Sequence, residues 1–185
     1  VIYECVRSQT VMDGYFAMPK GHFYIVSIVA FFAMLIAVLV GIAGSRLRNI
    51  KVAFLALSFI SLSEVFMVHG LSTPNFLLHA THLPGVASQL SVLLASFWLW
   101  LSAFSTDHPW VVGLSRLKHW LIPVWTGTLT LLCVLFLLFP HLVEFIPINL
   151  HPLNIAAALM TFAMNGFAIY RYYQSYMYSR FPLQL

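Results

Sequence analysis

The sequence predicts an all-α integral membrane protein, a bundle of about five transmembrane helices with the N-terminus outside the membrane and the C-terminus inside. Of its 185 residues, 61% are hydrophobic and 8% are charged, whereas about 25% of the residues of a soluble domain are charged. Apolar runs of membrane-crossing length follow one another along the chain, and basic residues gather in alternate connections between them. Because a lipid-exposed backbone must satisfy its own hydrogen bonds, these runs are expected to be helices.

Proline and charged residues divide the apolar sequence into separate spans. Pro84 opens the third span, Pro140 closes the fourth and Pro152 opens the fifth. The predicted spans cover residues 22–44, 52–69, 86–105, 120–139 and 153–170. They form a single transmembrane domain that occupies the whole chain.

The two ends of the chain lie outside these spans. Residues 1–21 are expected to be an extracytoplasmic segment, and residues 171–185 a cytoplasmic tail. The tyrosines that begin the tail form an aromatic belt beside two arginines, so the fifth helix is expected to run on to about Arg180. The apolar ending FPLQL indicates truncation before a further helix.

Basic residues indicate the direction of the helices. Seven of the nine lysines and arginines fall in the first and third connections or after the fifth span, namely Arg46, Arg48, Lys51, Arg116, Lys118, Arg171 and Arg180. The connections at residues 70–85 and 140–152 contain none. Because cytoplasmic loops carry an excess of these residues, we expect both connections to lie outside in a multi-pass membrane protein.

Small residues line one face of two predicted helices. The stripe of the first helix contains Ala30, Ala33, Ala37, Gly41 and Gly44, and that of the third contains Ser88, Ser91, Ala95 and Ser102. Such stripes let helix backbones approach closely in lipid. The first and third helices are therefore expected at the centre of the contacts.

Six of the eight histidines are expected on the outer side: His22, His69, His79, His82, His141 and His151. A haem b would take two histidines from different segments, His69 with His141 or His151. His79 and His82 are three residues apart and, together with His69, form a candidate site for copper or zinc. The alternative is that these histidines are interfacial residues that cap helices.

A few polar residues lie within the spans. Glu64 is in the second span, where a carboxyl group is costly and marks a functional hypothesis by default. It is expected either to hydrogen-bond a neighbouring helix or to relay protons or hold a ligand. Gln89 in the third span and Asn165 in the fifth are interpreted as interhelical hydrogen bonds.

Two stretches resemble a known group of bacterial membrane proteins. VHGLSTPN ends the second span, and YRYYQSYMYSRFPLQL follows the fifth. Both are similar to stretches of multi-pass modules in bacteria such as the filamentous phototrophs. Those modules resemble N-terminal sensory regions of signalling proteins, where they are joined to cyclase or kinase domains. The resemblance covers the second to fifth helices and implies sensory input, or an accessory subunit where no output domain follows. It also implies a location in the bacterial inner membrane.

The sequence therefore predicts a non-catalytic membrane module, either a sensory input domain or an accessory subunit of a larger membrane complex, such as one that transfers electrons. Phosphate-binding glycine loops, a nucleophile elbow and His-Glu-x-x-His are absent, so no catalytic residue is assigned. The alternatives are a haem- or copper-binding electron-transfer subunit and a small proton-coupled transporter that uses Glu64. The expected partners are the lipid bilayer and other membrane subunits, and no nucleic acid.

Overall fold

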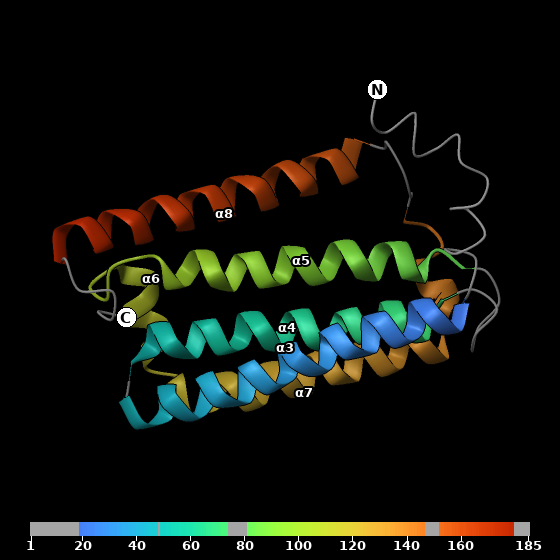
Figure 1. Cartoon of the computed structure of the whole chain (residues 1–185), viewed down its shortest axis with the longest axis horizontal. Helices are drawn as coiled ribbons and strands as arrows, with labels where there is room; N and C mark the ends of the chain where they lie inside the picture. Colours follow the sequence, from blue (N-terminus) through green and yellow to red (C-terminus); the bar gives the residue numbers. More distant parts are fainter. Residues whose placement is uncertain (1–18, 48, 74–80, 147–151, 180–185) are drawn as a thin grey trace.

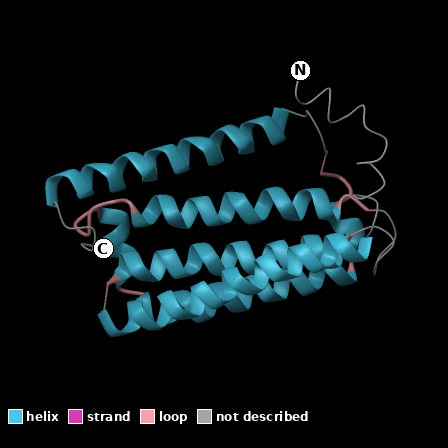
Figure 2. Cartoon of the chain, viewed as in Figure 1, coloured by secondary structure: helices cyan, strands magenta, loops and turns pink. Residues whose placement is uncertain are grey.

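The computed structural model describes residues 19–47, 49–73, 81–146 and 152–179 of the chain, and these contain helices and loops but no strand (Figure 2). Five helices are long and apolar enough to cross a membrane: α3 (Pro19–Leu47), α4 (Ile50–Leu71), α5 (Leu83–Ser102), α7 (Lys118–Leu138) and α8 (Pro152–Ser179). Two shorter elements are α6 (Pro109–Ser115) and the 3-10 helix η1 (Pro140–Val143). The prediction of an all-helical chain with five spans of membrane-crossing length is confirmed.

The helix boundaries differ from the predicted spans at several ends. Helix α5 begins at Leu83 with Pro84 in its first turn, where the missing proline N–H costs no hydrogen bond. It ends at Ser102, before the predicted end at Ser105. Helix α8 runs on to Ser179, close to the expected end of the tyrosine-rich extension.

Helix α4 lies at the centre of the bundle. It packs against α3, α5 and α7, whereas α8 packs mainly against α5, on the side away from α4 (Figure 1). In the most apolar stretch of α4, 56% of the residues are buried, against 6% in α7 and in α8. The expectation that the first and third helices form the centre is therefore wrong, because a small-residue stripe marks only a contact face. The stripe of α3 faces α4, whereas that of α5 includes Ser88 and Ser102, which lie at the contacts with α8.

Three serines of α4 explain its position. The Ser58 hydroxyl donates to the Ala95 carbonyl of α5 at 2.7 Å, and the Ser63 hydroxyl donates to the Ala30 carbonyl of α3 at 2.7 Å. The Ser61 hydroxyl accepts a hydrogen bond from the Trp125 indole of α7 at 2.9 Å. Each serine thus connects α4 to a different neighbour through a polar contact that lipid cannot replace.

The predicted stripe of α3 faces α4. Ala30, Ala33 and Ala37 are buried, and a side chain added at Gly44 would have its first carbon 3.3 Å from the Ala53 backbone nitrogen of α4. The absence of larger side chains therefore lets the α3 and α4 backbones approach closely.

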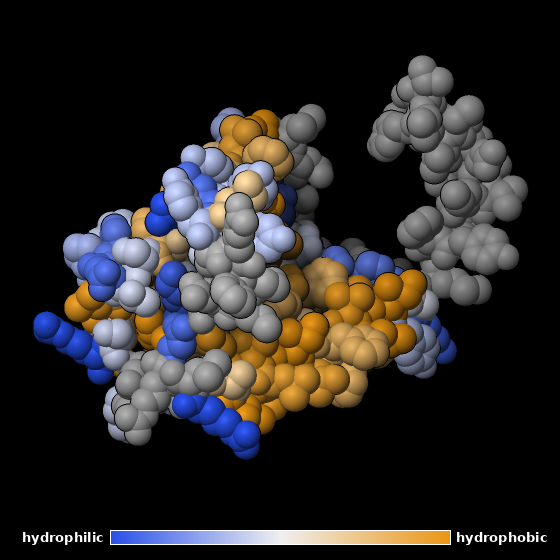
Figure 3. Space-filling view, turned by 60° about the vertical axis from the view of Figure 1, so that its left-hand side comes forward, coloured by the Kyte–Doolittle hydropathy of each residue, from blue (hydrophilic) through white to orange (hydrophobic). Residues whose placement is uncertain are grey.

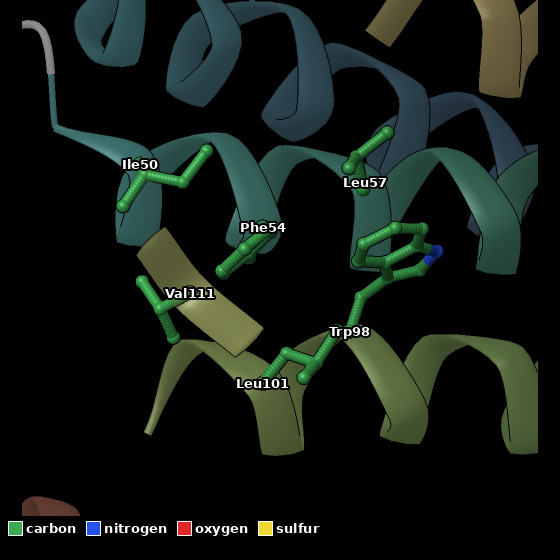
Figure 4. Close-up of a cluster of buried hydrophobic side chains, with 6 residues drawn as sticks. All are labelled: Ile50, Phe54, Leu57, Trp98, Leu101 and Val111. Atoms are coloured by element: carbon green, nitrogen blue, oxygen red, sulfur yellow. The ribbon is translucent and has the colours of Figure 1, made fainter. Parts of the chain in front are cut away.

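A buried apolar cluster joins α4, α5 and α6 at one end of the bundle. It consists of Ile50, Phe54, Leu57, Trp98, Leu101 and Val111 (Figure 4). The rings of Phe54 and Trp98 stack with their centroids 5.7 Å apart. Helix α6, which the hydropathy pattern does not reveal because it has only seven residues, contributes the fully buried Val111. A second cluster joins α4, α5, α7 and η1 at the opposite end.

The two ends of the bundle differ in charge. At the basic end, where α3 and α5 end and α4 begins, the described residues include Arg46, Lys51, Arg116 and Arg171. Figure 3 turns this end forward and shows hydrophilic residues gathered there, with hydrophobic surface along the flank of the helices. At the histidine end, where α3 begins, α4 ends and α5 begins, the described residues include His22, His69, His82 and His141.

Candidate functional site

A pair of histidines joins three helices at the histidine end. The Nε2 atoms of His22 on α3 and His69 on α4 lie 3.1 Å apart. The Nδ1 atom of His69 lies 2.8 Å from the Pro84 carbonyl oxygen of α5. Both side chains are partly buried. The His22–His69 pair therefore connects the first three long helices through two consecutive polar contacts.

The Pro84 carbonyl determines where the protons of this pair lie. A carbonyl oxygen can only accept, so His69 must carry its proton on Nδ1. The neutral ring then presents an unprotonated Nε2, which accepts from the Nε2–H of His22. Both nitrogens of His69 are thus used, and its ring orientation is held from two sides.

Local packing holds the His69 ring in place. Phe66, one helical turn earlier on α4, stacks on the ring with centroids 5.2 Å apart and an interplanar angle of 18°. Gly70 lets α4 approach α3 at this level, because a side chain there would meet Val26 at 2.8 Å. His22 and His69 can therefore reach each other from adjacent helices.

The other predicted histidine ligands lie apart from this pair or outside the described residues. His82 is exposed at the start of α5, and His141 is exposed in η1, where its ring centroid lies 6.0 Å from that of Phe139. His79 and His151 lie outside the described residues. Within the described ranges, no three His, Cys, Asp or Glu side chains lie close enough to hold one metal ion. The haem site and the three-histidine metal site stay predictions.

His22 is the residue that the sequence-based site assignments missed. The sequence predicts that His22 lies on the same side of the membrane as His69, and this shared side was the only indication of a pairing that the sequence offered. The pairing itself depends on the rotation of α3 against α4, and on the backbone carbonyl of Pro84, which no residue pattern reveals.

Glu64 faces a groove between α3, α4 and α7. The groove has a volume of about 360 Å³, and Met34, Met67, Thr130 and Cys133 are among the residues that line it. The Thr130 hydroxyl hydrogen-bonds the carboxyl group, while the Oε2 atom is buried and has no hydrogen-bond partner among the described residues. Glu64 therefore contacts a neighbouring helix, as one of its two predicted roles requires, and its role in proton or ligand binding stays a hypothesis.

Gln89 and Asn165 lie together at a second groove, between α5 and α8. This α5–α8 groove has a volume of about 470 Å³, and half of its lining residues are polar: Ser88, Gln89, Asn154, Thr161 and Asn165. The Asn165 amide donates to the Ser96 hydroxyl of α5 at 2.9 Å, which is an interhelical hydrogen bond of the kind the sequence predicted. Gln89, by contrast, has an exposed side chain.

The shape of this groove follows from how α8 is attached to α5. The Tyr172 and Ser102 hydroxyls lie 2.7 Å apart near the basic end, and Asn165 bonds Ser96 further along. Beyond these contacts the two helices diverge toward the start of α8 (Figure 1). The groove therefore opens in the half of the bundle that leads to the histidine end.

A comparison of the chain with known protein families, with curated proteins and with solved structures finds no match.

Proposed function

We propose that the chain is a non-catalytic, multi-pass membrane module that assembles with a partner membrane protein, as an accessory subunit or as a sensory input module. A transmembrane helix of the partner occupies the α5–α8 groove. The observation that carries this proposal is the groove itself, an open and mainly apolar surface that includes polar side chains such as Gln89 and Thr161, on the side of a bundle of helices long and apolar enough to cross a membrane.

The chemistry of the groove favours a helix over lipid. Amide and hydroxyl groups that face hydrocarbon without hydrogen-bond partners are costly. A neighbouring helix can supply partners to Gln89 and Thr161, which lipid tails cannot do. The groove also contains Ala157 and Ala158, whose small side chains permit close approach of a second backbone.

The attachment of α8 supports the same proposal. Many large apolar side chains of α8 are exposed, and Phe162 at the groove is 79% exposed. A helix that contacts mainly one neighbour among the described residues has most of its circumference available there for contacts with lipid or with another protein.

The proposed orientation places the histidine end outside and the basic end inside, in the bacterial inner membrane. It rests on the separation of charge between the two ends. Among the described residues, five lysines and arginines belong to the basic end, Arg46, Lys51, Arg116, Lys118 and Arg171, whereas the histidine end has Lys20.

Substitutions in the groove are expected to weaken the assembly. Gln89→Leu and Thr161→Val each remove a polar group offered to the partner helix. Because interhelical hydrogen bonds in membranes contribute about 0.6–1.7 kcal/mol, each change should lower the affinity roughly threefold to eighteenfold. The measurement is the fraction of the chain that migrates in a larger complex after extraction of native membranes with mild detergent.

Thr128→Val on α7 is the matched control, because Thr128 is exposed and does not line the α5–α8 groove. It should leave the fraction in the complex unchanged. A complex that survives both groove substitutions, or one that contains only copies of this chain, would contradict the proposal.

A further inference from the structure

The His22–His69 pair has the geometry of two ligands of one metal ion. The two Nε2 atoms come from different helices and lie 3.1 Å apart. Two nitrogens that each lie 2.0–2.1 Å from a tetrahedral ion are about 3.3 Å apart. A shift of a few tenths of an ångström, together with a rotation of the rings that directs both Nε2 lone pairs to one point beside the line joining them, would therefore accommodate an ion.

The second contact of His69 is the one that metal-binding histidines usually make. Their other ring nitrogen donates to a carboxylate, a backbone carbonyl or water, which fixes the tautomer and the orientation of the ring. The Pro84 carbonyl accepts from His69 Nδ1 at 2.8 Å. His69 thus already presents an unprotonated Nε2 with its outer partner in place.

His22 requires only a change of tautomer. In the metal-free pair its proton lies on Nε2 and points to His69. When this proton moves to Nδ1, the His22 Nε2 lone pair becomes available to an ion and the ring stays neutral. Binding therefore needs no net loss of a proton from either imidazole.

We propose that His22 and His69 bind a divalent transition-metal ion of the class that imidazole favours, Cu²⁺ or Zn²⁺. Phe66, which stacks on His69, also lines the α5–α8 groove, but neither histidine lines it, and this proposal does not rest on the proposed function. Within the described residues no third His, Cys, Asp or Glu completes the ligand set. Water or an external ligand fills the remaining positions, as in metal sites that keep an open coordination position.

The test uses the purified full-length protein without a polyhistidine tag, titrated with Zn²⁺ by calorimetry and with Cu²⁺ by electron paramagnetic resonance. The wild-type protein should bind one equivalent of ion with nitrogen ligands that His69→Ala and His22→Gln abolish. His22→Gln is the sharper variant, because its amide N–H can still donate to His69 Nε2, while an amide is a poor ligand for these ions.

His141→Ala is the matched control, since His141 is an exposed histidine at the same end. The His141→Ala variant should still bind one equivalent of the ion, whereas the His22→Gln variant should not. If His22→Gln binds both ions as the wild-type protein does, or if the wild-type protein binds neither, the pair is an interhelical hydrogen bond only and the proposal is overturned. Unfolding measurements on each variant distinguish loss of the site from loss of the fold.

Discussion

Replacing Phe54 with alanine is expected to destabilise the bundle strongly, by about 3–5 kcal/mol. The Phe54 side chain is fully buried and belongs to the cluster that joins α4, α5 and α6. In lipid, helix association depends on close packing, so the cavity left between Trp98 and Val111 removes the contacts that hold these helices together. The measurement is the midpoint of unfolding in mild detergent.

Phe32→Ala separates this effect from the general loss of an aromatic ring. Phe32 lies on α3 and is 56% exposed. Because few protein atoms surround it, its truncation should change the stability by about 0.5 kcal/mol or less. If Phe54→Ala and Phe32→Ala lowered the unfolding midpoint equally, the cluster around Phe54 would not be what holds the helices together.

Gly70→Leu is expected to separate α4 from α3 at the histidine end. The first side-chain carbon would lie 2.8 Å from Val26 Cγ1 and 3.3 Å from Val26 Cβ. Valine in a helix has one strongly preferred rotamer, so it cannot turn away without strain. Overpacking of this kind costs about 1–3 kcal/mol. Both the unfolding midpoint and metal binding by the His22–His69 pair should fall.

Gly127→Leu provides the comparison for Gly70→Leu. Gly127 lies within α7, and a side chain there would meet nothing within 4 Å. Since leucine has a higher helix propensity than glycine, this variant should be as stable as the wild-type protein or slightly more stable. If Gly70→Leu is also as stable as the wild-type protein, the close approach of α3 and α4 is not required for the stability of the bundle.

The helices were more predictable from the sequence than their arrangement. Apolar length and the positions of proline mark all five spans, because crossing a membrane constrains composition strongly. The central place of α4 was missed, although Ser58 and Ser61 are visible as polar residues within its apolar run. Together with Ser63 they face three different helices, and the identity of those neighbours depends on helix rotation and tilt, which hydropathy does not encode.

The candidate site was predictable in its location and not in its contacts. The distribution of basic residues groups six histidines on one side, and the structure pairs two of them, His22 and His69. Glu64 was correctly expected within the helix bundle, but its partner Thr130 belongs to α7, whose packing on α4 could not be read from periodicity. Short elements such as α6 carry too few residues for a periodic signal.

The central proposal is that the module crosses the bilayer five times with its histidine end outside. Two exposed acidic residues allow a direct test: Glu144 follows η1 at the histidine end, and Asp107 lies between α5 and α6 at the basic end. In a background with serine in place of Cys5 and Cys133, each position receives a single cysteine, Glu144→Cys or Asp107→Cys. A membrane-impermeant maleimide is then applied to intact bacterial cells and to opened membranes.

We expect Glu144→Cys to be labelled in intact cells and Asp107→Cys to be labelled only after the membranes are opened. If only Asp107→Cys were labelled in intact cells, the orientation would be the opposite of the one proposed. Labelling of both positions in intact cells would contradict the placement of the two ends on opposite sides of the membrane.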